Sequence, residues 1–138
     1  MISQSFYMRN HLDDVDRMVI SLKSVVEGNL DQMAKFKFEI CMSEALKNIV
    51  KHARTPHKDA PIEVTLSETN STLVVEVFDP IDADVFDLRV HARELGKVDL
   101  MAESGRGLGL IIQCADLVNY SLSGDRHCLE LQFLKQRI

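Results

Sequence analysis

Apolar and polar residues alternate in several short segments after residue 61, and this alternation constrains the fold more than any other feature. From Ile62 to Ser67 every second residue is aliphatic, which is typical of a strand with one buried face. The segment 68–71 predicts a turn, and a second strand follows over Leu73–Phe78. Asp79-Pro80 ends that strand, because proline cannot donate a hydrogen bond to a sheet ladder.

Three further strands are predicted from the rest of the sequence. Ser3–Arg9 forms a short first strand, and two more run over Val118–Ser123 and Cys128–Leu134, joined by a turn over 123–126. The alternation gives the sheet one apolar face, so a layer of helices must cover that face. The predicted fold class is therefore α+β: a two-layer sandwich with a mixed, mostly antiparallel sheet and helices on one face.

Two helices are predicted between the first and second strands. Asn10 caps one that runs from His11 to Glu27, and Gly28-Asn29 ends it. Asp31 then caps a long helix that continues to about Arg54. Part of the core stripe of this long helix consists of Phe36, Ile40, Ala45 and Ile49.

The composition indicates an ordinary globular protein. Of its 138 residues 46% are hydrophobic and 27% charged, and a single domain over residues 1–138 is expected. The formal net charge of −5 and the lack of a basic run argue against direct binding to nucleic acid. The sequence contains no apolar run of about 18 residues, the length that a membrane-spanning helix requires. The three cysteines lie apart in apolar contexts, which indicates reduced thiols and a cytoplasmic location.

Three alternate glycines form the first candidate functional feature. Gly105, Gly107 and Gly109 lead into an amphipathic helix predicted over Leu108–Leu117. Glycine lets backbone N–H groups approach a ligand closely, and the first turn of a helix offers unpaired N–H groups that suit a phosphate. Arg106 offers a charge-assisted contact. The alternative interpretation is a flexible loop that only caps the helix.

The second candidate feature lies on the long helix. Glu44 and Asn48 are four residues apart and share one ridge with Ile40 and His52. The amide oxygen of Asn48 suits Mg²⁺, which prefers oxygen ligands, and Glu44 can accept a proton from a hydroxyl that attacks a terminal phosphate. The alternative is a solvated flank whose polar pair contributes a few tenths of a kcal/mol. The ridge runs beside an apolar set, Cys41, Ala45 and Ile49.

Together the two features resemble a known superfamily. The segment Ser43-Glu-Ala-Leu-Lys-Asn-Ile-Val-Lys-His-Ala53 resembles the N box of the GHKL ATPases and kinases, and Gly105-Arg-Gly-Leu-Gly-Leu110 resembles their second glycine-rich box. The order and spacing are similar especially to those of the anti-sigma factor serine/threonine-protein kinases, over nearly the whole chain. The resemblance implies a Bergerat-type ATP-binding fold that uses ATP and Mg²⁺.

The resemblance also implies a role for each matching residue. Glu44 is the expected catalytic base, and Asn48 the expected Mg²⁺ ligand. Asp79 matches the acidic residue that accepts a hydrogen bond from the adenine amino group. The loop expected to wrap the triphosphate contains Gly105, Arg106, Gly107, Leu108 and Gly109.

Partners follow from the same resemblance. Such kinases bind a sigma factor and phosphorylate a serine or threonine on a small antagonist, the anti-anti-sigma protein, in a cycle called partner switching. The resemblance therefore implies an ATP-dependent serine/threonine-protein kinase that acts as an anti-sigma regulatory factor. It also implies a homodimer.

The sequence departs from the family pattern after Asp79. The first glycine box of the family runs Asp-x-Gly-x-Gly, whereas Pro80-Ile-Asp-Ala83 contains no glycine. Ile81 is β-branched and tolerates positive φ badly. A second hypothesis is therefore a degenerate, non-catalytic protein-binding module of the same fold with weak or no ATP binding.

A third hypothesis is the ATP domain of a histidine kinase. Against it, no phosphoacceptor helix hairpin is recognised before the domain, and the excursion from Ile81 to Ser104 is short for its lid. This excursion, with a helical piece predicted over Val85–Leu95, is more typical of a lid or binding loop than of an idle linker.

Overall fold

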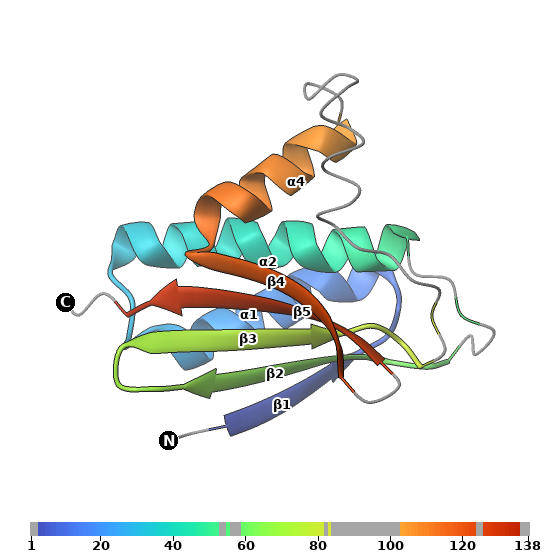
Figure 1. Ribbon diagram of the computed structural model, residues 1–138, viewed down its shortest axis with the longest axis horizontal. Helices are drawn as coiled ribbons and strands as arrows, with labels where there is room; N and C mark the ends of the chain where they lie inside the picture. The colour runs from blue at the N-terminus through green and yellow to red at the C-terminus, as the bar shows by residue number, and fades with distance from the viewer. Residues whose placement is uncertain are drawn as a thin grey trace.

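Five strands form one sheet, whose order β1-β2-β3-β5-β4 places the last strand between the third and the fourth (Figure 1). The strands are β1 (Ser3–Met8), β2 (Ile62–Glu68), β3 (Thr72–Phe78), β4 (Leu117–Ser123) and β5 (Arg126–Leu134). Each neighbouring pair is antiparallel. The computed structural model describes residues 3–52, 55, 59–81, 83, 103–123 and 126–135, with the backbone alone for 103–108 and 122–123.

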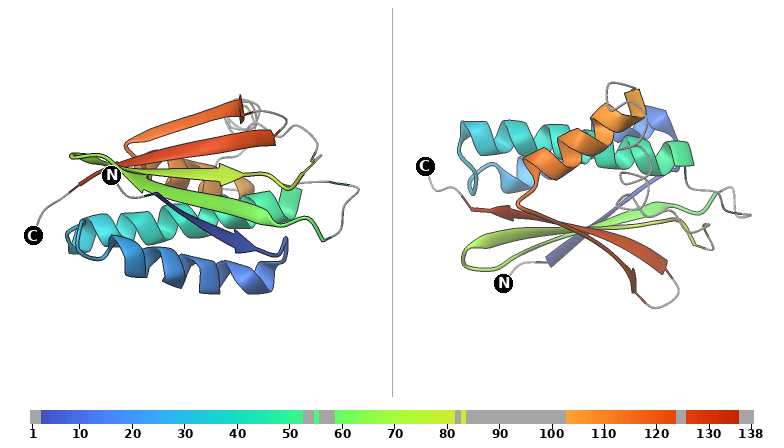
Figure 2. Two further views of the ribbon diagram at one scale, coloured as in Figure 1. Left: turned by 90° about the horizontal axis from the view of Figure 1, so that it is seen from below. Right: turned by 45° about the horizontal axis from the view of Figure 1, so that its top comes forward.

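The helices cover one face of this sheet and give the protein two layers (Figure 2). The described helices are the short 3₁₀ turn η1 (Leu12–Asp14), α1 (Val15–Val26), α2 (Gln32–His52) and α4 (Glu103–Cys114). Helix α2 packs against both α1 and α4. This arrangement confirms the predicted α+β sandwich with helices on one face of the sheet.

Burial in the central strands follows the alternation in the sequence. Ile62, Val64 and Leu66 of β2 are at most 3% exposed and face the helices, and their neighbours along the strand are half-buried on the other face. Strand β3 repeats the pattern. The core lies between the layers, where the ring of Phe38 on α2 meets that of Phe133 on β5 edge-on, with 5.0 Å between the ring centres.

The two predicted helix caps have different outcomes. Oδ1 of Asp31 accepts a hydrogen bond from the N–H of Ala34 at 2.8 Å, so Asp31 caps α2 as predicted. The prediction for Asn10 is wrong, since its Oδ1 is buried without a hydrogen-bond partner among the described residues. The chain first makes the turn η1, and α1 begins only at Val15. Asn10 therefore lies too far from the first N–H groups of α1 to cap them.

The predicted core stripe of α2 is wrong at one position. Phe36 is 59% exposed, whereas Phe38 is fully buried. Two residues rotate a side chain by about 200° around a helix, so burial of Phe38 turns Phe36 to the outside. Ala45 and Ile49 are buried as predicted, and Ile40 is half-buried. Within the described part of the chain, none of the helices combines the length and apolar character that a membrane span requires.

Candidate active site

Four elements converge at one end of the molecule (Figure 1). The C-terminal end of α2, the end of β3, the start of β5 and the N-terminal end of α4 all lie there. In the sequence these elements are separated by long stretches of chain. The fold therefore brings the elements that carry the predicted site residues to one side of the protein.

The polar ridge of α2 lies at the margin of the core, as predicted from its spacing. Cys41, Ala45 and Ile49 are at most 6% exposed, whereas Glu44 and Asn48 are half-buried. Side chains four residues apart share one face of a helix. Glu44 and Asn48 thus lie one turn apart, between the core and the surface.

Glu44 lines an open groove of about 580 Å³ formed by α1, α2 and α4. The groove walls include Ile20 from α1, Phe36 from α2 and Leu110 from α4. Ile20 is 66% exposed and Phe36 is 59% exposed. The carboxylate therefore borders a surface with large apolar side chains, and it lies near the helix that carries the glycines.

Asn48 has an unusual hydrogen-bonding state. Its amide nitrogen Nδ2 is buried and has no partner among the described residues. A buried donor left unpaired costs about 1–3 kcal/mol, so the packing of α2 alone does not explain an asparagine at this position. The chemistry of the side chain fits a ligand role, because the amide also carries the oxygen that Mg²⁺ prefers.

Asp79 follows β3 and is the one buried charged residue in the part of the chain that the structure describes, with 4% of its surface exposed. Its Oδ2 accepts a hydrogen bond from the hydroxyl of Tyr120 on β4 at 3.0 Å. Strand β5 holds its backbone: the Asp79 N–H donates to the carbonyl of His127 at 3.0 Å, and the Arg126 guanidinium donates to the Asp79 carbonyl at 3.1 and 2.9 Å. Burial raises the pKa of the Asp79 carboxyl to about 6, although the Tyr120 hydrogen bond and the charges of His127 and Arg126 lower it.

The surroundings of Asp79 contain three residues that are absent from the predicted site. They are Tyr120, Arg126 and His127. The ring of Tyr120 stacks on that of His127, with 5.7 Å between the centres and 14° between the planes, and Arg126 forms an ion pair with Glu63 at 2.8 Å. One signal was available: Tyr120 shares the inward register of its strand with Val118, and a buried tyrosine hydroxyl needs a partner.

The glycine segment differs from its prediction. Helix α4 runs from Glu103 to Cys114, so Gly105, Gly107 and Gly109 lie within the helix and not in a loop before it. The predicted range Leu108–Leu117 is wrong at both ends. No proline stops the helix before Leu108, each glycine costs only about 1 kcal/mol relative to alanine, and each added residue gains a hydrogen bond. At the other end, Leu117 already belongs to β4.

Part of this region lies outside the described residues. That holds for the side chains of Arg106 and Leu108 and for the helical piece predicted over 85–95. The side of α4 at Gly109 is open within the described part of the chain, because a Cβ atom added there meets none of its atoms within 4 Å. Neither packing nor a close backbone contact therefore requires glycine at this position of the helix.

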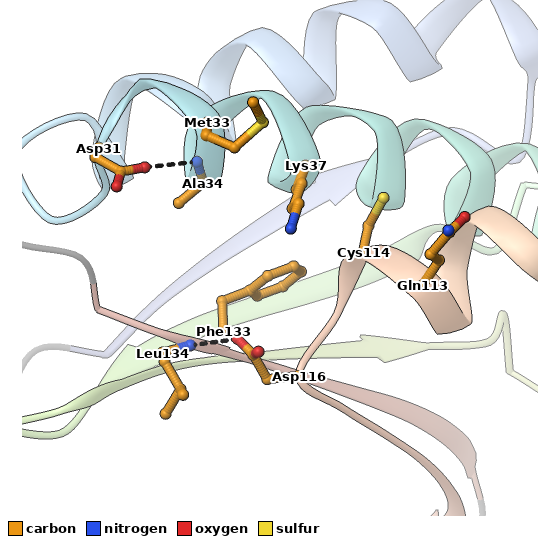
Figure 3. A pocket seen from close by; sticks show the side chains of 9 residues that line it. All are labelled: Asp31, Met33, Ala34, Lys37, Gln113, Cys114, Asp116, Phe133 and Leu134. Carbon is orange, nitrogen blue, oxygen red and sulfur yellow. Dashed lines mark hydrogen bonds between the residues drawn. The ribbon is translucent and has the colours of Figure 1, made fainter.

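A separate pocket of about 280 Å³ lies at the opposite end of α2 (Figure 3). It opens between the first turns of α2 and the last turn of α4, and Lys37 and Cys114 project into it. Both carboxylates of the pocket already accept a hydrogen bond from a backbone N–H group: Asp31 caps α2, and Asp116 accepts from the N–H of Leu134 at 2.7 Å. None of the predicted site residues lines this pocket, so we do not assign the active site to it.

Comparison with known proteins agrees with the fold. Residues 8–133 match the family model of the histidine kinase-like ATPase domain, and the chain belongs to this family. No curated protein matches the chain significantly. The protein is therefore a histidine kinase-like ATPase domain of the GHKL superfamily, as the two sequence boxes imply.

Proposed function

We propose that this protein is an ATP-dependent serine/threonine-protein kinase that acts as an anti-sigma regulatory factor. The observation that carries the proposal is the position of Glu44 and Asn48, one turn apart on α2 beside α4. The buried Asp79 follows β3, whose end lies on the same side of the fold as the C-terminal end of α2. Phosphoryl transfer needs mainly positioning and charge neutralisation. The carboxylate of Glu44, the amide of Asn48 and the adenine site at Asp79 meet these requirements.

Glu44 is the proposed general base. Its carboxylate borders the open groove, where a hydroxyl from another protein can approach it. A positioned base of this kind contributes about 100- to 10,000-fold to a rate. The half-buried setting of Glu44 supports the role, because it restricts the side chain without removing it from the surface.

Asn48 is the proposed ligand of Mg²⁺. The amide oxygen of Asn48 is the kind of ligand that Mg²⁺ prefers, and the packing of α2 alone does not explain an asparagine whose Nδ2 is buried without a partner among the described residues. When bound, Mg²⁺ neutralises charge on the transferring phosphoryl group. Asp79 is proposed to accept the hydrogen bond of the adenine amino group, and the segment 105–109 to contact the triphosphate.

The groove beside Glu44 supports a protein substrate. Ile20 and Phe36 are large, apolar and more than half exposed, and exposed apolar surface next to a reactive group marks an interaction site. Within the proposal, the substrate is a small antagonist protein with a serine or threonine, and the sequestered partner is a sigma factor. The homodimer expected from the resemblance belongs to the same proposal.

A specific observation favours the alternative, a non-catalytic protein-binding module with weak or no ATP binding. After Asp79 the chain makes a turn in which the N–H of Ala83 donates to the carbonyl of Pro80 at 3.1 Å. The hydroxyl of Thr55 donates to the carbonyl of Ile81. This turn occupies the position of the glycine box that other members of the family use beneath the nucleotide.

Thermal unfolding with and without Mg-ATP distinguishes the two functions. A ligand at a hundred times its Kd stabilises a protein by about 2.7 kcal/mol, so the kinase should melt at a higher temperature with millimolar Mg-ATP. Transfer of labelled phosphate from ATP to serine or threonine of a protein that co-purifies from native extract then tests the kinase itself. Lack of any shift at millimolar nucleotide would favour the binding module.

A further inference from the structure

The hydrogen bond between Tyr120 and Asp79 connects β4 to the end of β3 across the intervening β5. Tyr120 is partly buried and packs against the core, and its ring stacks on His127 of β5. Its hydroxyl donates to Oδ2 of Asp79, whereas Oδ1 has no donor among the described residues. One oxygen of a buried carboxylate is thus fixed by the protein, and the other is left for a ligand.

We propose that Tyr120 determines the base specificity of the nucleotide site by holding Asp79 as a carboxylate acceptor for an exocyclic amino group, so that adenine is preferred to guanine. This inference rests on the proposed function, because it assigns the base of the nucleotide to Asp79. It adds a positioning residue, Tyr120, that acts through Asp79 and does not itself need to contact the nucleotide.

The chemistry of the two bases gives the preference its direction. Adenine presents an amino group, which donates a hydrogen bond, where guanine presents a carbonyl oxygen, which only accepts. An ionised carboxylate accepts a hydrogen bond from the adenine amino group. It repels the guanine carbonyl oxygen and leaves it without a donor. A protonated carboxyl group carries a hydroxyl donor and matches the guanine oxygen instead. The charge state of Asp79 therefore decides which base fits.

Tyr120 is needed to keep Asp79 ionised, because the burial of Asp79 favours the protonated carboxyl group. Burial raises the pKa of Asp79 to about 6, and the hydroxyl of Tyr120 opposes this effect together with the charges of His127 and Arg126. Cys128, the remaining titratable neighbour on β5, has its own pKa raised by burial and stays uncharged. Without the Tyr120 hydrogen bond, the pKa of Asp79 rises further, and more of the carboxyl is protonated at neutral pH.

The variant Tyr120→Phe tests the proposal, because it removes only the hydroxyl. We expect calorimetric titration of the whole chain with Mg-ATP and Mg-GTP to show an ATP-to-GTP affinity ratio about tenfold lower at pH 7 than in the wild type, because a hydrogen bond to a charged group contributes about 1.5 kcal/mol, which corresponds to a factor of about ten. The pH below which ATP affinity declines should also move upward. In the nucleotide-free chain, the ¹³C titration of the Asp79 carboxyl should have a higher midpoint.

Tyr7→Phe is the matched control, since Tyr7 is the other tyrosine of the chain and is 64% exposed on β1. A Tyr120→Phe protein with an unchanged affinity ratio and an unchanged Asp79 midpoint would overturn the inference while the proposed function stands. Failure of the wild type to bind either nucleotide would overturn both. Asp79→Asn provides a second test: it should lower the ratio by itself, and additive effects in the double variant would also reject the coupling.

Discussion

The thiol of Cys41 on α2 lies 3.8 Å from the carbonyl oxygen of Ile111 on α4, and both residues are fully buried. This contact joins the helix that carries Glu44 and Asn48 to the helix that carries the glycines. Burial raises the pKa of the Cys41 thiol to about 12, so the group remains neutral and donates its hydrogen to the carbonyl. The relative position of the two helices is thus fixed in the core, below the candidate site.

Thiol reactivity should follow this burial. Cys41 and Cys128 are at most 2% exposed, with pKa values raised to about 12, whereas Cys114 is half-buried. About one of the three thiols should therefore react quickly with Ellman's reagent in the native protein, and the other two should react only on unfolding. Cys114→Ser should remove the fast phase. Fast reaction of two or more thiols would contradict the burial described for Cys41 and Cys128.

Glu44→Gln should abolish phosphoryl transfer and leave nucleotide binding in place. The amide cannot accept the proton, so we expect the rate to fall about 100- to 10,000-fold, measured as labelled phosphate transferred from ATP. Glu39→Gln is the matched control, because Glu39 lines the same groove but pairs with Lys23 at 3.0 Å. Equal rates for Glu44→Gln and the wild type would refute the role of Glu44 as base.

Asn48→Ala should separate stability from binding. The change removes a buried donor that has no partner in the described structure, so we expect the free energy of unfolding to stay the same or rise by about 1 kcal/mol. The dependence of ATP affinity on Mg²⁺ should be largely lost, as measured by titration with and without the metal. Asn70→Ala, at an exposed turn, should change neither quantity. Retained Mg²⁺ dependence would exclude Asn48 as the ligand.

Asp79→Asn should change how stability depends on pH. The pKa of Asp79 is about 6 in the folded protein and 3.8 ordinarily, so the folded carboxyl stays protonated between these values while the unfolded one ionises. The wild type should lose about 2–3 kcal/mol relative to the variant as the pH rises from about 4 to about 6, with no further change above that. Urea unfolding at several pH values measures the difference. Parallel curves would show that Asp79 is not protonated in the folded state.

Gly109→Ala should stabilise α4 and weaken nucleotide binding. A Cβ atom at this position meets nothing within 4 Å among the residues that the structure describes, and alanine is favoured over glycine inside a helix by about 0.5–1 kcal/mol. If the segment 105–109 must unwind around a triphosphate, the same substitution opposes that change. Gly28→Ala, equally open, should leave ATP affinity unaltered. Unchanged affinity in both variants would argue against a phosphate-contacting role for Gly109.

Much of the fold was predictable because its signals are local. The alternation over Ile62–Ser67 and the cap at Asp31 depend on neighbours within a few residues, and both appear in the structure. The choice between Phe36 and Phe38 was not predictable in the same way. Both positions tolerate an apolar side chain on a helix, and only the packing of α2 against β5 selects Phe38.

The site was predictable in part for a similar reason. Glu44 and Asn48 are one helical turn apart, so their shared face follows from the spacing alone. The environment of Asp79 depends on Tyr120, Arg126 and His127, which are more than forty residues away in sequence and reach it only through the order of the strands. The extent of α4 was missed because glycine lowers helix propensity without preventing a helix.

The sheet order has a consequence for how the protein matures. Strand β5 inserts between β3 and β4, although it is synthesised after both of them. Before it inserts, the carboxylate after β3 has neither the backbone partners that β5 provides nor a neighbouring β4. A nascent chain therefore cannot form the surroundings of Asp79 before β5 pairs with β3. Competence for ATP should appear in a single late step, limited by long-range strand pairing and not by the rapid formation of the helices.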